Sequence, residues 1–251
     1  MSAESQLPPE RFIRTAQLIG AKQLANLHRA RVAVVGLGAV GSYTVEALAR
    51  AGVGALLLVD NDTVQYSNFN RQLYALESTL GRSKTAIAQA RVLDINPACK
   101  VETHQLFVDA TNAGTLLQSQ PDVVIDAIDS VASKVALLAA AARAGLPVIS
   151  VMGAASRRDP GLVRVADISV TRRCPLARFV RKKLRQHGVY NGICCLYSDE
   201  PPPRVTASPE PLERGRARRP VGSLSYMPGI FGLWAAGLAL EILLSKSPPQ
   251  Q

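Results

Sequence analysis

The sequence predicts an α/β fold with a doubly wound, mostly parallel sheet, helices on both faces and a C-terminal α/β extension. Three observations predict this fold. Short strand-like runs alternate with helical segments, a glycine-rich turn follows the first run, and acidic residues end two later runs. Alternating strands and helices produce a parallel sheet that binds ligands at the carboxyl ends of its strands. With 251 residues and 47% hydrophobic content, the chain can bury such a core.

The spacing of apolar residues gives the order of the elements. Residues 11–28 have apolar positions among charged neighbours, which is typical of an amphipathic helix. Between the expected strands lie helical segments, as parallel strands require a crossover connection that is usually a helix. Residues 163–170 are expected to add one or two strands after the main series. The main series has strands at 31–35, 55–59, 101–106, 123–126 and 147–151, and helices at 42–51, 83–93 and 134–144.

The glycine-rich turn follows the first strand and opens the first crossover helix, which is the context that a nucleotide-binding loop requires. Gly36 permits the tight turn, Gly38 lets a phosphate approach the backbone, and Gly41 lets helix and strand pack closely. Ala39 lies in the same loop. The N-terminus of the helix offers backbone N–H groups to an anion. These features predict a Rossmann-like nucleotide site for either NAD or ATP.

Four segments follow from these patterns. Residues 1–30 are expected to form an N-terminal helical arm, and residues 31–170 a nucleotide-binding Rossmann-like domain. Residues 171–222 combine a basic helix with a loop rich in proline, arginine and glutamate, a composition that predicts mobility. Residues 223–251 are expected to form an apolar helix and a tail.

Polar residues at later strand ends favour ATP over NAD. Asp60 ends the second strand, where a carboxylate can accept hydrogen bonds from ribose hydroxyls in either kind of site. Arg71 can donate two parallel hydrogen bonds to phosphate oxygens, and Lys84 opens the next helix near the same phosphates. Asp129 follows the fourth strand, where a carboxylate can hold magnesium. Further polar residues beside these positions are Asp62, Asn68, Asn70, Gln72, Asp126 and Ser130.

Positive charge dominates the chain, with a formal net charge of +10. Such a balance favours a polyanionic partner, either nucleic acid or an anionic membrane surface. One stretch has no acidic residue and would track phosphates if it formed a helix, although a merely solvated basic helix remains an alternative. We expect its apolar residues Leu176, Phe179, Val180 and Leu184 to face inward. The cations are Arg172, Arg173, Arg178, Arg181, Lys182, Lys183 and Arg185, with Arg214, Arg216, Arg218 and Arg219 further along.

Residues 223–244 are largely apolar and long enough to raise the alternative of a membrane span. One proline and three glycines interrupt them and Glu241 lies in the last turns, so we expect a buried helix. The first ten residues lack the apolar stretch of a signal peptide. The four cysteines form no Cys-x-x-Cys pair. We therefore expect a cytoplasmic protein without structural zinc.

Several of these motifs also match a known superfamily. They are Arg11-Phe12-Ile13-Arg14, the Gly36 loop, Asp60-x-Asp62-x-Val64, Ser67-Asn68-x-Asn70-Arg71-Gln72, Gly81-x-x-Lys84 and Asp126-x-x-Asp129-Ser130. The chain resembles the ubiquitin-activating-enzyme-like superfamily, which includes the adenylating enzymes of thiamine and molybdopterin biosynthesis. It looks most like the tRNA threonylcarbamoyladenosine dehydratase branch.

The resemblance implies a role for each matching residue. Asp60 would bind the ribose, and Asn68, Arg71 and Lys84 the triphosphate. Asp129 would bind magnesium. Such enzymes are homodimers with shared sites, so Arg14 would reach the phosphates bound by the neighbouring protomer.

The reaction implied is the ATP-dependent cyclisation of N6-threonylcarbamoyladenosine beside the tRNA anticodon. The threonyl carboxylate would become an acyl-adenylate, and attack by the carbamoyl group would close a ring with net loss of one water, leaving AMP and pyrophosphate. No enzyme thiol is needed for this chemistry. Ala39 departs from the superfamily, which usually has a fourth glycine there.

Other functions stay open at this point. Adenylation of a small ubiquitin-like sulfur-carrier protein is the nearest alternative, although relatives with that activity often carry two Cys-x-x-Cys pairs. An NAD-dependent oxidoreductase would leave Arg71 and Lys84 without a role. A cysteine desulfurase or sulfur acceptor is an open partner, and no DNA partner is expected.

Overall fold

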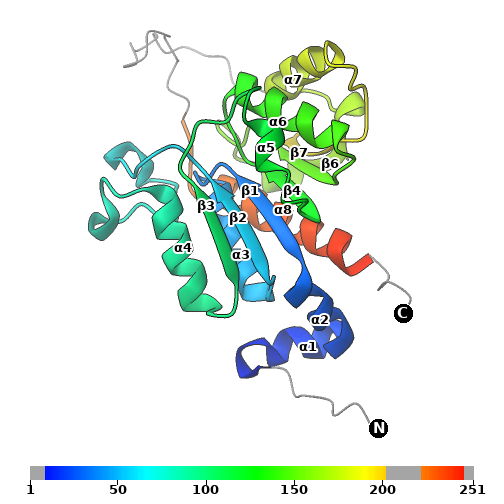
Figure 1. The fold of residues 1–251 in the computed structure, drawn as a ribbon. Helices are drawn as coiled ribbons and strands as arrows, with labels where there is room; N and C mark the ends of the chain where they lie inside the picture. The colour runs from blue at the N-terminus through cyan, green and yellow to red at the C-terminus, as the bar shows by residue number, and fades with distance from the viewer. Residues whose placement is uncertain (1–8, 202–221, 246–251) are drawn as a thin grey trace.

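The computed structural model describes residues 9–201 and 222–245, which form one seven-stranded sheet between helices (Figure 1). The strand order is β3-β2-β1-β4-β5-β7-β6. All neighbours are parallel except β6 and β7, which pair antiparallel at one edge. The predicted fold class is confirmed. The strands are β1 (Arg31–Val35), β2 (Ala55–Val59), β3 (Lys100–His104), β4 (Val123–Asp126), β5 (Val148–Val151), β6 (Val163–Asp167) and β7 (Cys194–Ser198).

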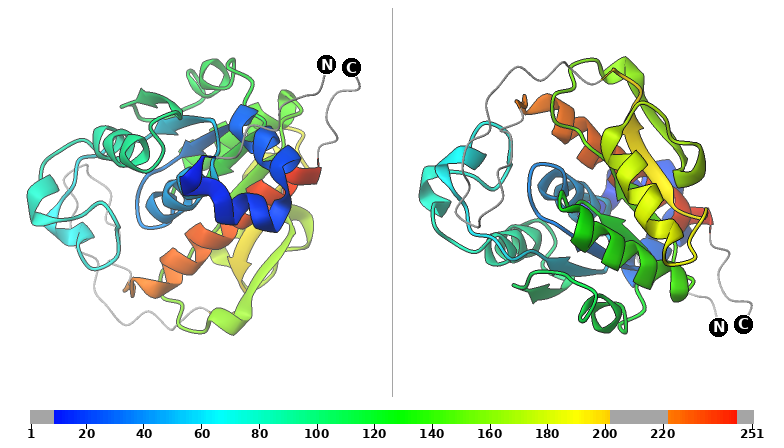
Figure 2. Two further views of the ribbon diagram at one scale, coloured as in Figure 1. Left: turned by 90° about the horizontal axis from the view of Figure 1, so that it is seen from below. Right: turned by 90° about the horizontal axis from the view of Figure 1, so that it is seen from above.

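Two helical layers explain why the central strands are apolar throughout. Val32 and Val34 of β1 face one hydrophobic cluster, and Ala33 and Val35 face the other, because side chains alternate along a strand. In Figure 2, which views the molecule from below and from above, helices lie on both sides of the sheet. One layer contains α3 (Gly41–Ala51), α4 (Lys84–Ile95) and α8 (Tyr226–Ser245), and the other contains α5 (Ala113–Leu116), α6 (Val131–Arg143) and α7 (Pro175–Arg185).

The N-terminal helical segment differs from the expectation of one helix over residues 11–28. A 3₁₀ turn, Glu10–Phe12, leads into α1 (Ile13–Ile19), and α2 (Ala21–Arg29) follows after a break. Gly20 makes the break with a φ of 84° and a ψ of 154°. Glycine adopts such angles without steric cost, whereas they interrupt the helical hydrogen-bond series.

The second half of the sheet contains a strand that the sequence pattern did not predict. β7 lies between β5 and β6, so residues from the expected 171–222 segment are part of the sheet itself. Residues 163–170 form β6 followed by a 3₁₀ turn, because the Asp167 side chain accepts a hydrogen bond from the Ser169 N–H at 2.8 Å. Most of the loop expected to be mobile lies outside the described residues.

Within the described residues, α8 is the one helix that is long and apolar enough to cross a membrane. The mean hydropathy of its most apolar 18-residue window is 1.7. Half of its apolar window is nevertheless buried inside the fold. A Cβ at Gly232 would lie 2.4 Å from the Val40 carbonyl oxygen, and the Thr44 hydroxyl donates to the Gly232 carbonyl at 3.0 Å. These close contacts with α3 fit the buried helix expected from the sequence.

Candidate active site

A cavity of about 1140 Å³ opens at the carboxyl ends of β1, β2, β4 and β5. Strand β1 lies between β2 and β4, so the chain reverses its direction of winding there, and ligands of doubly wound sheets bind at such a point. Residues that line the cavity after the first four strands of the chain, here called the first wall, are 36, 38–40, 60–62, 67–68, 71–72, 84, 106–108, 127–131 and 133. The second wall contains residues 152–157, 174–176, 223 and 228.

The glycine loop has the geometry that its sequence predicts. Gly36 has a φ of 93°, and a Cβ there would lie 2.7 Å from the Ala127 carbonyl oxygen. A Cβ at Gly41 would lie 1.8 Å from the Gly36 carbonyl oxygen, so only glycine lets helix α3 begin so close to the loop. Gly38 lines the cavity. Ala39 lies outside the positive-φ region, so its departure from glycine does not strain the backbone.

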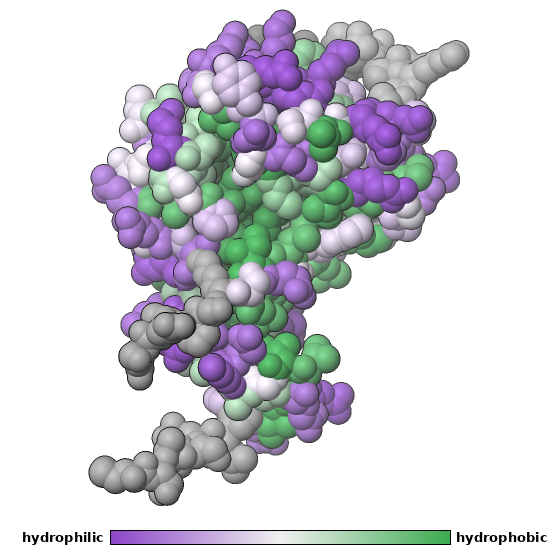
Figure 3. Space-filling model, turned by 90° about the vertical axis from the view of Figure 1, so that its right-hand side faces the viewer, coloured by the Kyte–Doolittle hydropathy of each residue, from purple (hydrophilic) through white to green (hydrophobic). Residues whose placement is uncertain are grey.

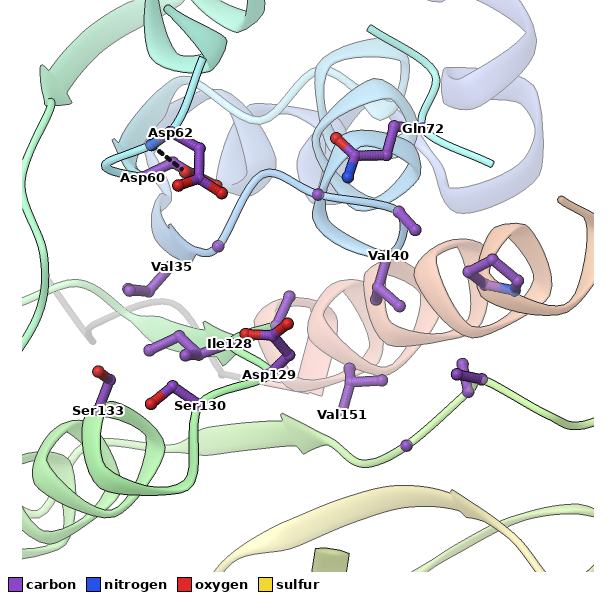
Figure 4. A pocket seen from close by; sticks show the side chains of 18 of the residues that line it. Val35, Val40, Asp60, Asp62, Gln72, Ile128, Asp129, Ser130, Ser133 and Val151 are labelled. Carbon is purple, nitrogen blue, oxygen red and sulfur yellow. Dashed lines mark hydrogen bonds between the residues drawn. The ribbon is translucent and has the colours of Figure 1, made fainter. Parts of the chain in front are cut away.

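Asp60 connects the end of β2 to the glycine loop. One carboxylate oxygen accepts the Leu37 N–H at 2.6 Å, and the other accepts the Asp62 N–H at 2.8 Å, the bond drawn in Figure 4. Burial raises the pKa of Asp60, whereas the nearby Lys84 ammonium and the two N–H groups oppose the increase. Each carboxylate oxygen can accept a second hydrogen bond, as a ribose hydroxyl would supply.

Lys84 presents a desolvated ammonium on the first wall. Its side chain is only 4% exposed, and its Nζ donates to the Asp62 carboxylate at 2.9 Å. The Lys84 backbone N–H also bonds the Asp62 carbonyl, which fixes the start of α4 against this turn. Asp62 is 58% exposed, so an incoming polyanion can compete for the ammonium.

Of the residues predicted for the site between β2 and α4, some line the cavity and one does not. Asn68 and Arg71 line the cavity, and Arg71 Nη1 donates to the Ser67 carbonyl at 2.8 Å. Asn70 lies outside the lining residues and donates to the Ser223 carbonyl at 3.1 Å, which ties this segment to the residues before α8. The structure thus places Asn68 and Arg71 at the cavity and Asn70 behind it.

Two aspartates after β4 have different environments. Asp126 is fully buried, and its carboxylate forms an ion pair with Lys134 at 2.7 Å. Asp126 therefore has a structural partner in the core, and the metal role expected from the sequence stays with Asp129. Asp129 lines the cavity, and Figure 4 shows its carboxylate pointing into the space below the glycine loop. Ser130, not Asp129, is the N-cap residue of α6, and it also lines the cavity.

The acidic residues of the first wall fit magnesium. Within residues 9–201 and 222–245, no group of three or more His, Cys, Asp or Glu side chains could hold a metal ion by itself. Mg²⁺ does not need such a cage, because it usually retains waters and bridges one or two carboxylates to substrate phosphates. Asp60, Asp62 and Asp129 all line the cavity and offer only oxygen ligands.

Arg14 lies away from the cavity of its own chain. It belongs to α1, which lies near the amino ends of the strands, at the opposite end of the sheet (Figure 1). The neighbouring Arg11 donates to the Ile95 carbonyl at the end of α4, which holds this segment there. Arg14 is therefore not part of the cavity of its own chain.

The basic stretch forms the amphipathic helix α7, with one correction. Ala177, Val180 and Leu184 are buried, whereas Phe179, expected inward, is 53% exposed because it lies about 100° from Val180 around the helix. Arg181 is also not available, because its Nη1 donates to backbone and hydroxyl oxygens of residues 168 and 171. The residues Arg214, Arg216, Arg218 and Arg219 lie outside the described residues. The exposed cations are Arg172, Arg173, Arg178, Lys182, Lys183 and Arg185.

Sequence reasoning missed the second wall. Gly153 and Ala154 follow β5, and Leu176 lies in the first turn of α7. These residues have no charge, so composition did not single them out, but their position after a parallel strand could have. Cys174 also lines the cavity at 5% exposure. Burial raises the pKa of the Cys195 thiol, so this cysteine is poorly suited to be a nucleophile.

This fold and site define a class of protein. The family model of the ThiF family matches residues 11–251, and the chain belongs to this family. It is 39% identical to tRNA threonylcarbamoyladenosine dehydratase of Bacillus subtilis over 239 residues, covering 93% of this chain and 94% of that protein. The enzyme of the same name from Escherichia coli is 35% identical over 257 residues, covering 96% of each.

The comparison with solved structures also finds tRNA N6-threonylcarbamoyladenosine dehydratase. The crystal structure of Escherichia coli tRNA N6-threonylcarbamoyladenosine dehydratase in complex with ATP matches with a TM-score of 0.85 and 34% identity. The match covers 94% of each chain. The fold is thus that of an ATP-binding dehydratase over nearly its whole length.

Proposed function

We propose that this protein is an ATP-dependent tRNA threonylcarbamoyladenosine dehydratase. The observation that carries the proposal is the first wall, where the glycine loop, Asp60, Arg71, Lys84 and Asp129 line one cavity. Its likeness to dehydratases extends over both walls, because the matches cover more than nine-tenths of the chain. The adenylation of a sulfur-carrier protein is the alternative, and no specific feature of the cavity favours it.

The first wall supplies what adenylation requires. A carboxylate becomes a good acyl donor when it attacks the α-phosphorus of ATP and pyrophosphate leaves. Asp60 would orient the ribose, and Arg71 and Lys84 would stabilise the charge that grows on the departing pyrophosphate. Asn68 would fix the backbone of the same segment, because its Oδ1 accepts the Gln65 N–H at 3.1 Å. The side chain of Asp62 would exchange its ion pair with Lys84 for contacts around the nucleotide.

Ring closure follows within one substrate molecule. The carbamoyl group attacks the activated acyl carbon, AMP leaves, and a ring replaces the open chain with net loss of one water. This step needs no second substrate to diffuse in, so positioning by the second wall can contribute as much as about 7–11 kcal/mol to lowering the barrier. Leu176 and the small residues 153–155 would hold the modified base by shape.

Magnesium belongs to the proposal through Asp129. The ion, when bound, supplies positive charge to the phosphates, and Asp129 with Ser130 would hold it beside them. The wall of oxygen ligands gives no reason to expect zinc.

The tRNA would be held by the positive charge of α7 and of the two arginines that precede it. Arg172, Arg173, Arg178, Lys182, Lys183 and Arg185 are exposed, and contacts of this kind bind the phosphate backbone without reading sequence. We assign tRNA, and not DNA, as the polyanion because the modified nucleoside occurs in tRNA. Arg181 is left out of this surface.

We further propose a cytoplasmic homodimer in which Arg14 completes the partner's site. Two observations support a second copy. Leu233 and Trp234 of α8 are 52% and 40% exposed, although large apolar side chains favour burial. Figure 3, which views the side that faces right in Figure 1, shows apolar side chains gathered in a band. A cysteine desulfurase or sulfur acceptor remains a candidate partner.

Mass spectrometry of nucleosides tests the proposed function. The substrate is tRNA that carries N6-threonylcarbamoyladenosine, incubated with protein, ATP and Mg²⁺. We expect the modified nucleoside to lose one water, with one AMP formed per event. An unchanged nucleoside, with ATP binding demonstrated, would contradict the proposal and favour adenylation of a carrier protein.

A further inference from the structure

Among the described residues, two fully buried charges lie on the elements that follow and precede the cavity-lining turn after β4. Lys134 of α6 and Asp126 at the end of β4 have side chains that are both 0% exposed, and their charged atoms are 2.7 Å apart. Lys134 Nζ also donates to the Val151 carbonyl at 2.9 Å. Ser150 donates to the same Asp126 oxygen at 2.6 Å. All of these groups are therefore paired, and the side chains of Asp126, Lys134 and Ser150 do not line the cavity.

This network connects the two walls. The second Asp126 oxygen accepts the Ile128 N–H at 3.1 Å, which shapes the turn that leads to Asp129. The Val151 carbonyl ends β5, immediately before the second wall begins at Met152. A single ammonium thus holds the segment of the proposed metal ligand and the start of the wall that would take the modified nucleoside. Figure 4 shows Ile128, Asp129 and Val151 around the cavity.

Stability alone does not explain buried charges here. Desolvation of two ions is expensive, and replacing a buried pair by apolar residues of similar volume is often neutral or stabilising. A paired lysine, by contrast, has directional bonds that fix backbone groups relative to one another. Outer-shell partners of this kind typically change metal affinity or activity by about 10–100-fold when they are removed.

We infer that Asp126, Lys134 and Ser150 are positioning residues that set how strongly Mg²⁺ and ATP bind together, through the placement of Asp129. The inference rests on the proposed function, because it assumes the metal role of Asp129. None of the three residues lines the cavity. Their effect passes through the backbone of residues 127–129 and of Val151.

The test measures the coupling between metal and nucleotide. Equilibrium dialysis gives the Kd for ATP without tRNA, once with Mg²⁺ and once with EDTA, and the Kd with EDTA divided by the Kd with Mg²⁺ is the coupling ratio. We expect Lys134→Met to reduce this ratio about 10–100-fold and Ser150→Ala to reduce it less. Lys134→Arg, which retains the charge, should recover part of it.

A matched control separates position from folding. Asn96 follows the last residue of α4, at the end of that helix far from Lys84, and is 3% exposed. Its side-chain amide donates to the Val53 carbonyl at 3.3 Å. Asn96→Ala should lower Tm and leave the coupling ratio unchanged. Lys134→Met or Ser150→Ala with lowered Tm but an unchanged ratio would overturn the inference, and so would a wild-type ratio of one. Nucleoside mass spectrometry of the wild type reports separately on the proposed function.

Discussion

The two walls of the cavity use different chemistry. The first wall presents charged side chains, among them Lys84 and Asp129, at the ends of strands close together in the sheet. The second wall presents small and apolar residues such as Gly153, Ala154 and Leu176, with the buried Arg157 as its cation. A polyanion is bound by charge, whereas a nucleoside is selected by shape. Under the proposed function, ATP and the modified base would enter one cavity and be recognised by separate surfaces.

The largest effect is expected on the first wall. Asp129→Asn keeps the shape of the side chain but removes its charge, and Lys84→Met removes the ammonium. Each should lower kcat by about 10²–10³-fold, as loss of one group that stabilises transition-state charge typically does. Steady-state formation of AMP at saturating ATP and modified tRNA measures kcat. A loss below tenfold in both variants would contradict the charge-based role of this wall.

The second wall should respond differently. A Cβ at Gly153 would meet nothing within 4 Å, so Gly153→Leu extends into open space without a clash. We expect KM for the modified tRNA to rise roughly tenfold, about 1.4 kcal/mol, with the Kd for ATP unchanged. Gly114→Leu is the matched control, since that glycine also has open space but lies outside the cavity. Equal effects on ATP and tRNA would show that the walls are not separate.

The exposed lysines of α7 should affect tRNA binding and not the chemistry in the cavity. Lys182→Glu with Lys183→Glu should weaken tRNA binding. Each lysine–phosphate ion pair that the substitutions remove should reduce the slope of log K against log salt by about 0.9 if the bound RNA is duplex. The substitutions leave the buried face of α7 intact. Lys100→Glu, which reverses the charge of an exposed lysine at the amino end of β3, is the control for a charge reversal away from α7. Identical salt slopes for all three proteins would remove α7 from the tRNA surface.

The smallest effect concerns the support of the first wall. Glu46 of α3 accepts hydrogen bonds from Arg50 and from Arg91 of α4, which clamps together the two helices that carry the glycine loop and Lys84. Burial raises the pKa of Glu46, but the bonds and charges of Arg91 and Arg50 outweigh it and the pKa is lowered.

Glu46→Gln should therefore cost about 0.5–1 kcal/mol of stability near neutral pH. A lowered pKa means that this contribution is complete above the ordinary glutamate value and is lost as the pH falls through the folded-state pKa. Urea unfolding at pH 7 and in the acid range measures the difference. A difference that grows on acidification would refute the sign.

Sequence and structure agree best in the first half of the chain. β1 and β2 begin and end at the predicted residues, because each is a short apolar run between a turn and an acidic or glycine-rich end. β7 was not predicted: Cys194–Ser198 is a brief run after a glycine-rich loop, and its place between β5 and β6 depends on partners far away in the sequence. Local sequence patterns predict a strand, a helix and the next strand along the chain, but they do not predict which strands become neighbours in the sheet.

The sequence by itself determined the glycine loop, the acids at strand ends, the helix-to-strand order and the resemblance to a nucleotide-adenylating family. These depend on residue type and spacing, which a chain carries before it folds. Only the tertiary structure decided that Asp126 is buried against Lys134 while Asp129, three residues later, lines the cavity. Burial decides that difference. A carboxylate in the core must be paired, as that of Asp126 is, whereas a carboxylate at a cavity is a candidate ligand for a metal ion.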